Sequence, residues 1–129
     1  MSAEVLANII SAGSLIATVL AFCCAQCKSK KAETIKRIND IYDFYYEICE
    51  KDFHEHYFKY VHYMSEVERF AVYVNEGVYN KHIVEKQMSI FLASQYDRFM
   101  REIIEQRRKQ FGRDSYYKNI EDLIKSFEK

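Results

Sequence analysis

The stretch that decides the fold is VLANIISAGSLIATVLAFCCAQC, residues 5–27, because it contains no charged side chain. As a helix this run is about 34 Å long, enough to cross the ~30 Å hydrocarbon core of a bilayer. Lys28, Lys30 and Lys31 follow it, whereas Glu4 is the one charged side chain before it. Basic residues mark the cytoplasmic end of a span. The sequence therefore predicts a single-pass anchor over residues 1–28 in the cell inner membrane, with the N-terminus outside.

A cleaved secretory signal is the alternative for an apolar N-terminal run. Such a signal carries basic residues before its apolar core, and here the basic residues come after it. A lipoprotein signal needs a small residue before the lipidated cysteine, but Phe22 precedes Cys23. We therefore expect an anchor that is not cleaved.

Small residues recur every fourth position in the predicted span, at Gly13, Ala17 and Ala21. Small side chains let helix backbones approach closely inside lipid, where polar side chains such as Asn8 and Ser11 can also form hydrogen bonds between helices. These five residues are the predicted packing or pore-lining positions. The pattern favours a homo-oligomer.

The remainder of the chain, residues 29–129, is predicted to be an all-α cytoplasmic domain. Apolar residues recur there at helical steps of three and four, and the chain has three Gly and no Pro. Short connections between helices are typical of antiparallel neighbours, so we expect a bundle of about four antiparallel helices.

Turn and cap residues set the expected helix boundaries in this domain. The first helix is expected over 32–51, and the second ends before Gly77, which can adopt a left-handed conformation. Asn80 is a suitable cap for a long third helix over 81–111. Gly112 then breaks that helix, and Asp114 is the predicted cap of a short closing helix.

Aromatic residues crowd the region from Tyr42 to Tyr63 on every face of the expected helices. We do not expect one core to bury them all, and aromatic residues with one polar end are common at protein interfaces. The predicted subunit interface comprises Tyr42, Tyr45, Tyr46, Tyr57 and Tyr60. Contact with the membrane surface is the rival interpretation.

Several classes of function lack the residues they need. Residues 28–129 carry nineteen Lys/Arg and eighteen Asp/Glu, so no strong field attracts nucleic acid. Cys24 and Cys27 form a C-x-x-C without a second pair, and His54 and His56 diverge on a helix, so no metal site is expected. The sequence has no phosphate-binding glycine loop and no nucleophile motif. We therefore expect no catalytic residue and no cofactor.

A family resemblance comes from VERFAVYVNEGVY, residues 67–79, and EQRRK, residues 105–109. These stretches resemble a family of bacterial single-span membrane proteins known as a domain of unknown function. The matched positions are Glu68, Gly77, Tyr96 and Arg107. The resemblance suggests that Glu68 and Arg107 form a structural ion pair.

The layout also resembles that of the membrane accessory proteins of type VI-B CRISPR systems, which have one N-terminal span, a cytoplasmic helical domain and assemble as pores. Those proteins are described with a HEPN-like Arg/His pair. None of the Arg residues here is followed four to six residues later by His. The likeness therefore concerns a membrane role rather than a nuclease.

These observations predict a non-enzymatic membrane protein that self-assembles, as a pore-forming or membrane-perturbing effector in bacterial antiviral defence. One alternative is a membrane-tethered scaffold or inhibitor that binds another membrane protein. A second is a degenerate HEPN-like nuclease. The expected partners are the lipid bilayer, further copies of the chain, and a membrane or defence-system protein.

Overall fold

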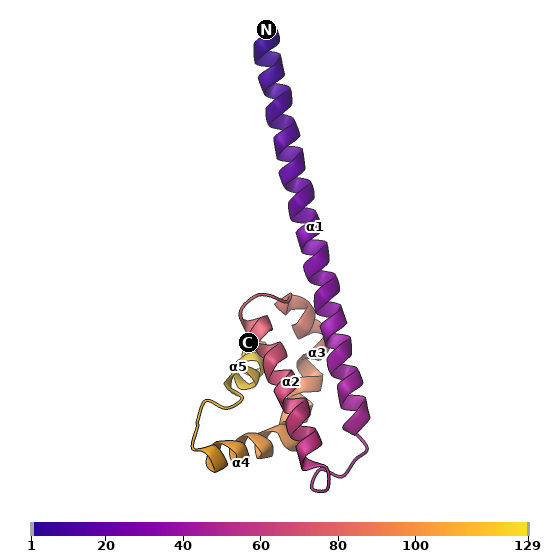
Figure 1. The fold of residues 1–129 in the computed structure, drawn as a ribbon, viewed down its shortest axis with the longest axis vertical. Helices are drawn as coiled ribbons and strands as arrows, with labels where there is room; N and C mark the ends of the chain where they lie inside the picture. The colour runs from indigo at the N-terminus through magenta and orange to yellow at the C-terminus, as the bar shows by residue number, and fades with distance from the viewer. Residues whose placement is uncertain (1, 129) are drawn as a thin grey trace.

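The computed structural model describes residues 2–128, which are helical throughout and contain no strand. One very long helix, α1, projects far beyond a compact group of shorter helices (Figure 1). The elements in chain order are α1 (Ala3–Ile48), α2 (Tyr57–Asn75), α3 (Lys81–Gln95), a π-helical segment η1 (Tyr96–Met100), α4 (Arg101–Phe111) and α5 (Lys118–Phe127).

Helix α1 joins two elements that the sequence suggested were separate. Its 46 residues include the predicted span and most of the first predicted domain helix, so the expected boundary at residues 28 and 29 falls inside one helix. Between Gly13 and the end of α1 at Ile48 the chain has neither Gly nor Pro, so no residue of these types interrupts the helix. The Ser2 hydroxyl oxygen caps the start by accepting a hydrogen bond from the Val5 amide at 3.2 Å.

The two halves of α1 have opposite environments. From Ala3 to Glu33 every residue is exposed, whereas Ile38, Ile41 and Ile48 are buried against the other helices. The second half of α1 contacts α2 and α3, and α5 packs on α2 and α3 from the other side. The chain reverses direction between α1 and α2 and again between α2 and α3 (Figure 1).

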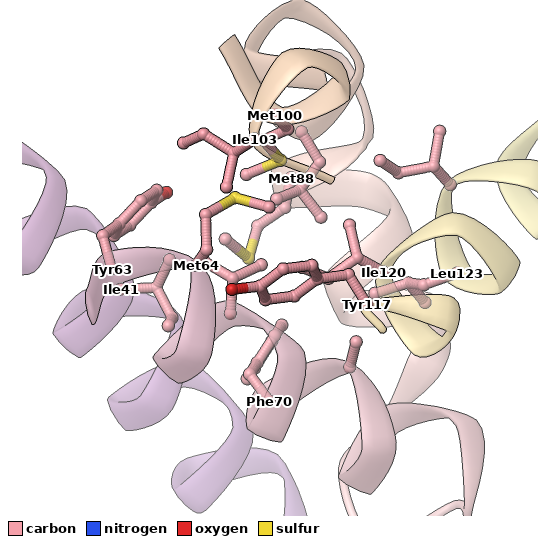
Figure 2. Packing of buried hydrophobic residues seen from close by; sticks show 14 of the residues in the cluster. Ile41, Tyr63, Met64, Phe70, Met88, Met100, Ile103, Tyr117, Ile120 and Leu123 are labelled. Carbon is pink, nitrogen blue, oxygen red and sulfur yellow. The ribbon is translucent and has the colours of Figure 1, made fainter. Parts of the chain in front are cut away.

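Three methionines lie at the centre of the core. Figure 2 shows Met64 of α2, Met88 of α3 and Met100 of η1 among the aliphatic side chains of the same buried cluster. Flexible thioether side chains fill irregular gaps between helices that cross at different angles. Nearby, the buried Tyr63 hydroxyl donates a hydrogen bond to Oε1 of the buried Gln95 at 2.6 Å.

The connection between α2 and α3 follows the prediction. Gly77 has φ +80°, the left-handed conformation that ends a helix with little cost for glycine. The Asn80 side chain accepts a hydrogen bond from the Ile83 amide at 3.1 Å and so caps α3. The Asn80 amide itself donates to the Thr34 hydroxyl of α1 at 2.9 Å, which ties this loop to the long helix.

The predicted helix over residues 81–111 begins and ends where expected, at Lys81 and Phe111, but it contains a π-helical turn. Residues Tyr96–Met100 form this π-helical turn, and α4 then runs at a steep angle to α3 (Figure 1). A π turn places one extra residue in the helix and shifts which side chains face inward. Both Ile103 and Ile104 are buried after it.

The predicted start of the last helix was wrong. Asp114 lies in a turn, and α5 begins at Lys118 after Tyr117, which has φ +61° and is buried. The preceding break at Gly112, with φ +62°, does match the prediction. Asp114 does not cap α5, because a side chain from another helix accepts the hydrogen bonds of the first amides of α5, as described below.

Candidate functional site

The principal candidate site is the exposed half of α1. It is the one helix in residues 2–128 that is long and apolar enough to cross a membrane, and none of its apolar window is buried. Its large exposed side chains are Val5, Leu6, Ile9, Ile10, Leu15, Ile16, Val19, Leu20 and Phe22. Monomeric soluble proteins rarely expose a continuous apolar surface of this size.

The predicted packing residues Asn8, Ser11, Gly13, Ala17 and Ala21 all lie on this exposed half. A Cβ atom added at Gly13 would meet nothing within 4 Å. Gly13 therefore has no packing role inside the chain itself. A larger side chain at this position could clash only with another molecule.

Helical geometry shows that these five residues do not share one face. At ~100° per residue, Ser11 lies roughly 160° around the helix from Gly13. A shallow groove lined by Ala7, Ile10, Ser11, Ser14, Leu15 and Thr18 instead follows the Ser11 side. The Thr18 hydroxyl donates to the Ser14 carbonyl at 2.9 Å, so that polar group is already satisfied within the helix.

Sequence reasoning missed the pattern along this groove. Small residues recur at alternating steps of four and three, at positions 7, 11, 14, 18, 21 and 25, and each is Ala, Ser or Thr. That 3.5-residue period is typical of helices that pack in a left-handed pair or bundle. We call these six residues the small-residue seam. Ser11 and Ala21 belong to it, whereas Asn8, Gly13 and Ala17 lie outside it.

The predicted aromatic interface requires a correction. Tyr60 is 5% exposed, and its hydroxyl donates to the carbonyls of Ile48 and Lys51 at 3.0 and 2.9 Å, so it is a core residue. Tyr57 is half-buried against Phe53, with the ring centroids 5.8 Å apart. Because α1 and α2 pack face to face, many of their aromatic rings meet in the core.

The α1 aromatic residues divide between the core and the surface. Tyr42 is half-buried, and its hydroxyl donates to the Gln87 carbonyl at 2.7 Å. Tyr45 is also half-buried, with its ring 5.3 Å from that of Phe91. Tyr46 is 70% exposed and is the member of the predicted interface that remains free to contact another molecule.

The predicted ion pair between Glu68 and Arg107 is not among the ion pairs that residues 2–128 form. Glu68 Oε1 instead accepts hydrogen bonds from the backbone amides of Asn119 and Ile120, at 2.7 and 3.3 Å. These amides lie in the first turn of α5, so Glu68 of α2 caps a helix 50 residues away in the sequence. Burial raises the pKa of the Glu68 carboxyl, against the opposing effect of the two amides.

Arg108, the residue after Arg107, forms an ion pair that joins α4 to α5. Its Nη2 bonds to Glu121 of α5, and its Nε donates to the Tyr116 carbonyl at 2.9 Å. Glu121 also accepts from the Tyr96 hydroxyl at 3.1 Å. Arg107 faces a different direction from Arg108, because adjacent residues are ~100° apart on a helix. Its guanidinium lies over the Phe111 ring, 4.7 Å from the ring centroid.

A second candidate site is an open cleft of about 520 Å³ between α1 and α2. Phe44, Phe70 and Tyr79 contribute aromatic side chains to its lining. The charged residues that line it are Arg37, Asp40, Asp43, Glu47, Glu66 and Arg69, two basic against four acidic. Its formal charge is therefore −2, which suits a cationic group better than an anionic one. No three His, Cys, Asp or Glu residues in the described part of the chain are placed to hold a metal ion.

The comparisons with known proteins show the family. The model of the family described as "Domain of unknown function (DUF4760)" matches residues 8–127, and the chain belongs to this family. The match begins within the apolar half of α1 and extends into α5, so the projecting helix and the helical domain form one family unit. No curated protein and no solved structure matches the chain.

Proposed function

We propose that this member of the family is a non-enzymatic, single-pass membrane protein that self-assembles through the small-residue seam of α1. The observation that carries the proposal is that the first half of α1 is fully exposed and apolar and bears a continuous seam of Ala, Ser and Thr. In lipid, helices associate by close backbone packing and polar contacts, which such a seam provides.

The proposed location is the cell inner membrane, with the N-terminus outside and the helical domain in the cytoplasm. Five basic residues support this orientation: Lys28, Lys30, Lys31, Lys36 and Arg37 follow the apolar run. A reporter fused after Lys129 is expected to be active in the cytoplasm. Activity of a periplasmic reporter at the same position would contradict the orientation.

A pore-forming or membrane-perturbing role in bacterial antiviral defence is the form of the proposal that we favour. Two observations support this role. The layout of the chain resembles that of the CRISPR accessory proteins, and the proposed span contains polar side chains. Asn8 and Ser11 can face water or a neighbouring helix once several spans meet. Ion flux through planar bilayers that contain the purified protein tests this role, and Asn8→Leu is expected to reduce the flux more than it changes subunit number.

The assembly experiment compares substitutions that add the same bulk on different faces of α1. Ser14→Leu places a large side chain in the small-residue seam and is expected to shift the detergent-solubilised protein toward monomer, as measured by light scattering. Ala12→Leu adds bulk on the far side of the helix and serves as the matched control. Both changes make the span more apolar, so neither hinders insertion.

Gly13→Leu separates the seam from the alternative ridge of Gly13, Ala17 and Ala21. Nothing in the chain surrounds Gly13, so any effect on mass must come from another copy. Loss of the oligomer with Gly13→Leu but not Ser14→Leu would assign packing to the ridge. An unmutated protein that is monomeric at micromolar concentration would contradict self-assembly altogether.

The cleft between α1 and α2 favours the scaffold or inhibitor as a second candidate function. Its aromatic side chains and net acidic lining suit a basic side chain from a partner protein. Asp43→Asn with Glu47→Gln would remove two of its charges. If the scaffold function holds, partner capture falls with this double variant while the oligomer size stays the same.

A further inference from the structure

The loop between α2 and α3 lies at the level where α1 would leave the membrane. In Figure 1 this loop is at the end of the domain nearest the projecting half of α1. Val78 of the loop lines a groove with Gln26, Cys27, Ser29, Lys30 and Glu33 of α1. The hydrogen bond from the Asn80 amide to Thr34 holds the loop against the helix.

The length of the apolar run gives the position of this groove relative to the bilayer. The uncharged residues end at Cys27, and the headgroup layer adds roughly 5–7 Å on each side of the hydrocarbon core. At ~1.5 Å per residue, that layer covers about residues 28 to 32 of a span lying along the membrane normal. Val78 is therefore beside the part of α1 that would lie among lipid headgroups.

The chemistry of the loop fits such a surface. Val78 is 51% exposed although its side chain is apolar. The exposed Lys81 and His82 follow at the start of α3, and Lys28, Lys30 and Lys31 are exposed on α1. Lys30 lines the same groove as Val78, whereas the charged residue within the loop itself is the acidic Glu76. An apolar side chain beside a lysine is typical of protein segments that rest on phospholipid, where the lysine meets phosphate groups.

We propose that residues 76–80 dock on the headgroup layer of the bilayer that α1 crosses, with Val78 inserted between the headgroups. This inference rests on the proposed insertion of α1. It adds a second contact with the lipid, so that the helical domain is held against the membrane rather than hanging from a single helix.

The chain has no tryptophan, so a single introduced Trp reports on one place. The full-length variants Val78→Trp, Leu15→Trp and Ile90→Trp are reconstituted in phosphatidylcholine vesicles with or without brominated acyl chains. Val78→Trp is expected to lose roughly half of its emission to the bromines, because a side chain at the headgroup and acyl boundary lies within their reach. Leu15→Trp reports insertion of the span, and Ile90, which is 85% exposed on α3, is the matched surface control.

The three variants separate failure of this inference from failure of the proposed function. Quenching at positions 15 and 78 but not at 90 supports docking of the loop. Quenching at 15 alone overturns the docking and leaves the anchor intact. Quenching at all three positions also overturns it, since the domain would then lie on the bilayer by another face. No quenching at position 15 overturns the anchor and the inference that depends on it.

Discussion

Removal of the Glu68 side chain should destabilise the domain through the helix that it caps. Glu68→Ala leaves the first-turn amides of α5, at Asn119 and Ile120, without their acceptor. Loss of a capping side chain costs about 0.5–2 kcal/mol, and the half-buried location favours the upper part of that range. For a domain of this size, 1 kcal/mol corresponds to roughly 4–8 °C in melting temperature.

Glu68→Gln separates the hydrogen bonds from the charge. The Gln carbonyl oxygen can still accept from both amides, and Oε2 of Glu68 is buried without a hydrogen-bond partner. Replacing the carboxylate with an amide should therefore cost much less than truncation to Ala. The original expectation of a Glu68–Arg107 pair predicts the opposite, namely a large loss with Gln.

The pH dependence has a definite sign. Burial raises the Glu68 pKa above its ordinary value of 4.5 in the folded protein, so the folded state holds this proton more tightly than the unfolded state does. The associated stability is fully present below the unfolded pKa and is lost as pH rises through the folded pKa. The wild type should therefore lose stability relative to Glu68→Gln as the pH is raised from acidic to neutral.

Near-UV circular dichroism of the full chain in detergent, followed during heating at several pH values, measures these differences. Glu66→Ala is the matched control, because Glu66 is on the same helix and its ion-pair partner is the exposed Arg69 at 3.8 Å. The capping role would be refuted by Glu68→Ala melting no lower than Glu66→Ala. It would equally fail if Glu68→Gln melted as low as Glu68→Ala.

Substitutions at three further positions test the packing and the turns by the same melting assay. Tyr63→Phe removes the donor to Gln95 and is expected to cost about 1–3 kcal/mol, because the buried amide then lacks its partner; unchanged melting would argue against that bond. Asn80→Ala should cost about 1 kcal/mol by leaving the Ile83 amide uncapped, and Asn80→Ser should recover most of it. Gly112→Ala should cost about 1–2 kcal/mol because φ is +62°, and a neutral result would contradict the left-handed turn.

Local patterns predicted the parts of the fold that depend on nearby residues. The apolar run, the left-handed Gly77 and the Asn80 cap can each be recognised from a few adjacent positions, and the structure contains the helix and both turn features. The buried residues Met64, Val67, Ala71 and Val74 of α2 follow steps of three and four in the same way. These features involve few competing interactions.

Features that depend on distant contacts were missed. The start of α5 could not be predicted from Asp114, since its cap comes from Glu68 in another helix. The π turn at Tyr96–Met100 contains neither Gly nor Pro, so no local sequence signal marks it. Its effect is to change which side chains of the helix face the core. The burial of Tyr60 depends on how α1 and α2 face each other, which periodicity within one helix does not reveal.

The apolar half of α1 was predicted, and which of its residues pack against another copy stays a prediction. A search for small residues every fourth position found Gly13, Ala17 and Ala21 but overlooked alternating steps of four and three. That second pattern was visible in the sequence and needed only a 3.5-residue template. The cleft between α1 and α2 could not have been found in this way, because it combines residues from three parts of the chain.

The unbroken course of α1 has a geometric consequence for any assembly. If α1 crosses a membrane as proposed, the direction in which the small-residue seam faces is fixed relative to the orientation of the domain, because α1 is one helix without a break between the two. One alanine inserted at residue 29 would rotate one part against the other by ~100° and lengthen the helix by ~1.5 Å, whereas seven alanines would nearly restore the phase. If neighbouring copies touch through both spans and domains, assembly should vary periodically with the number of inserted residues rather than decline steadily with it.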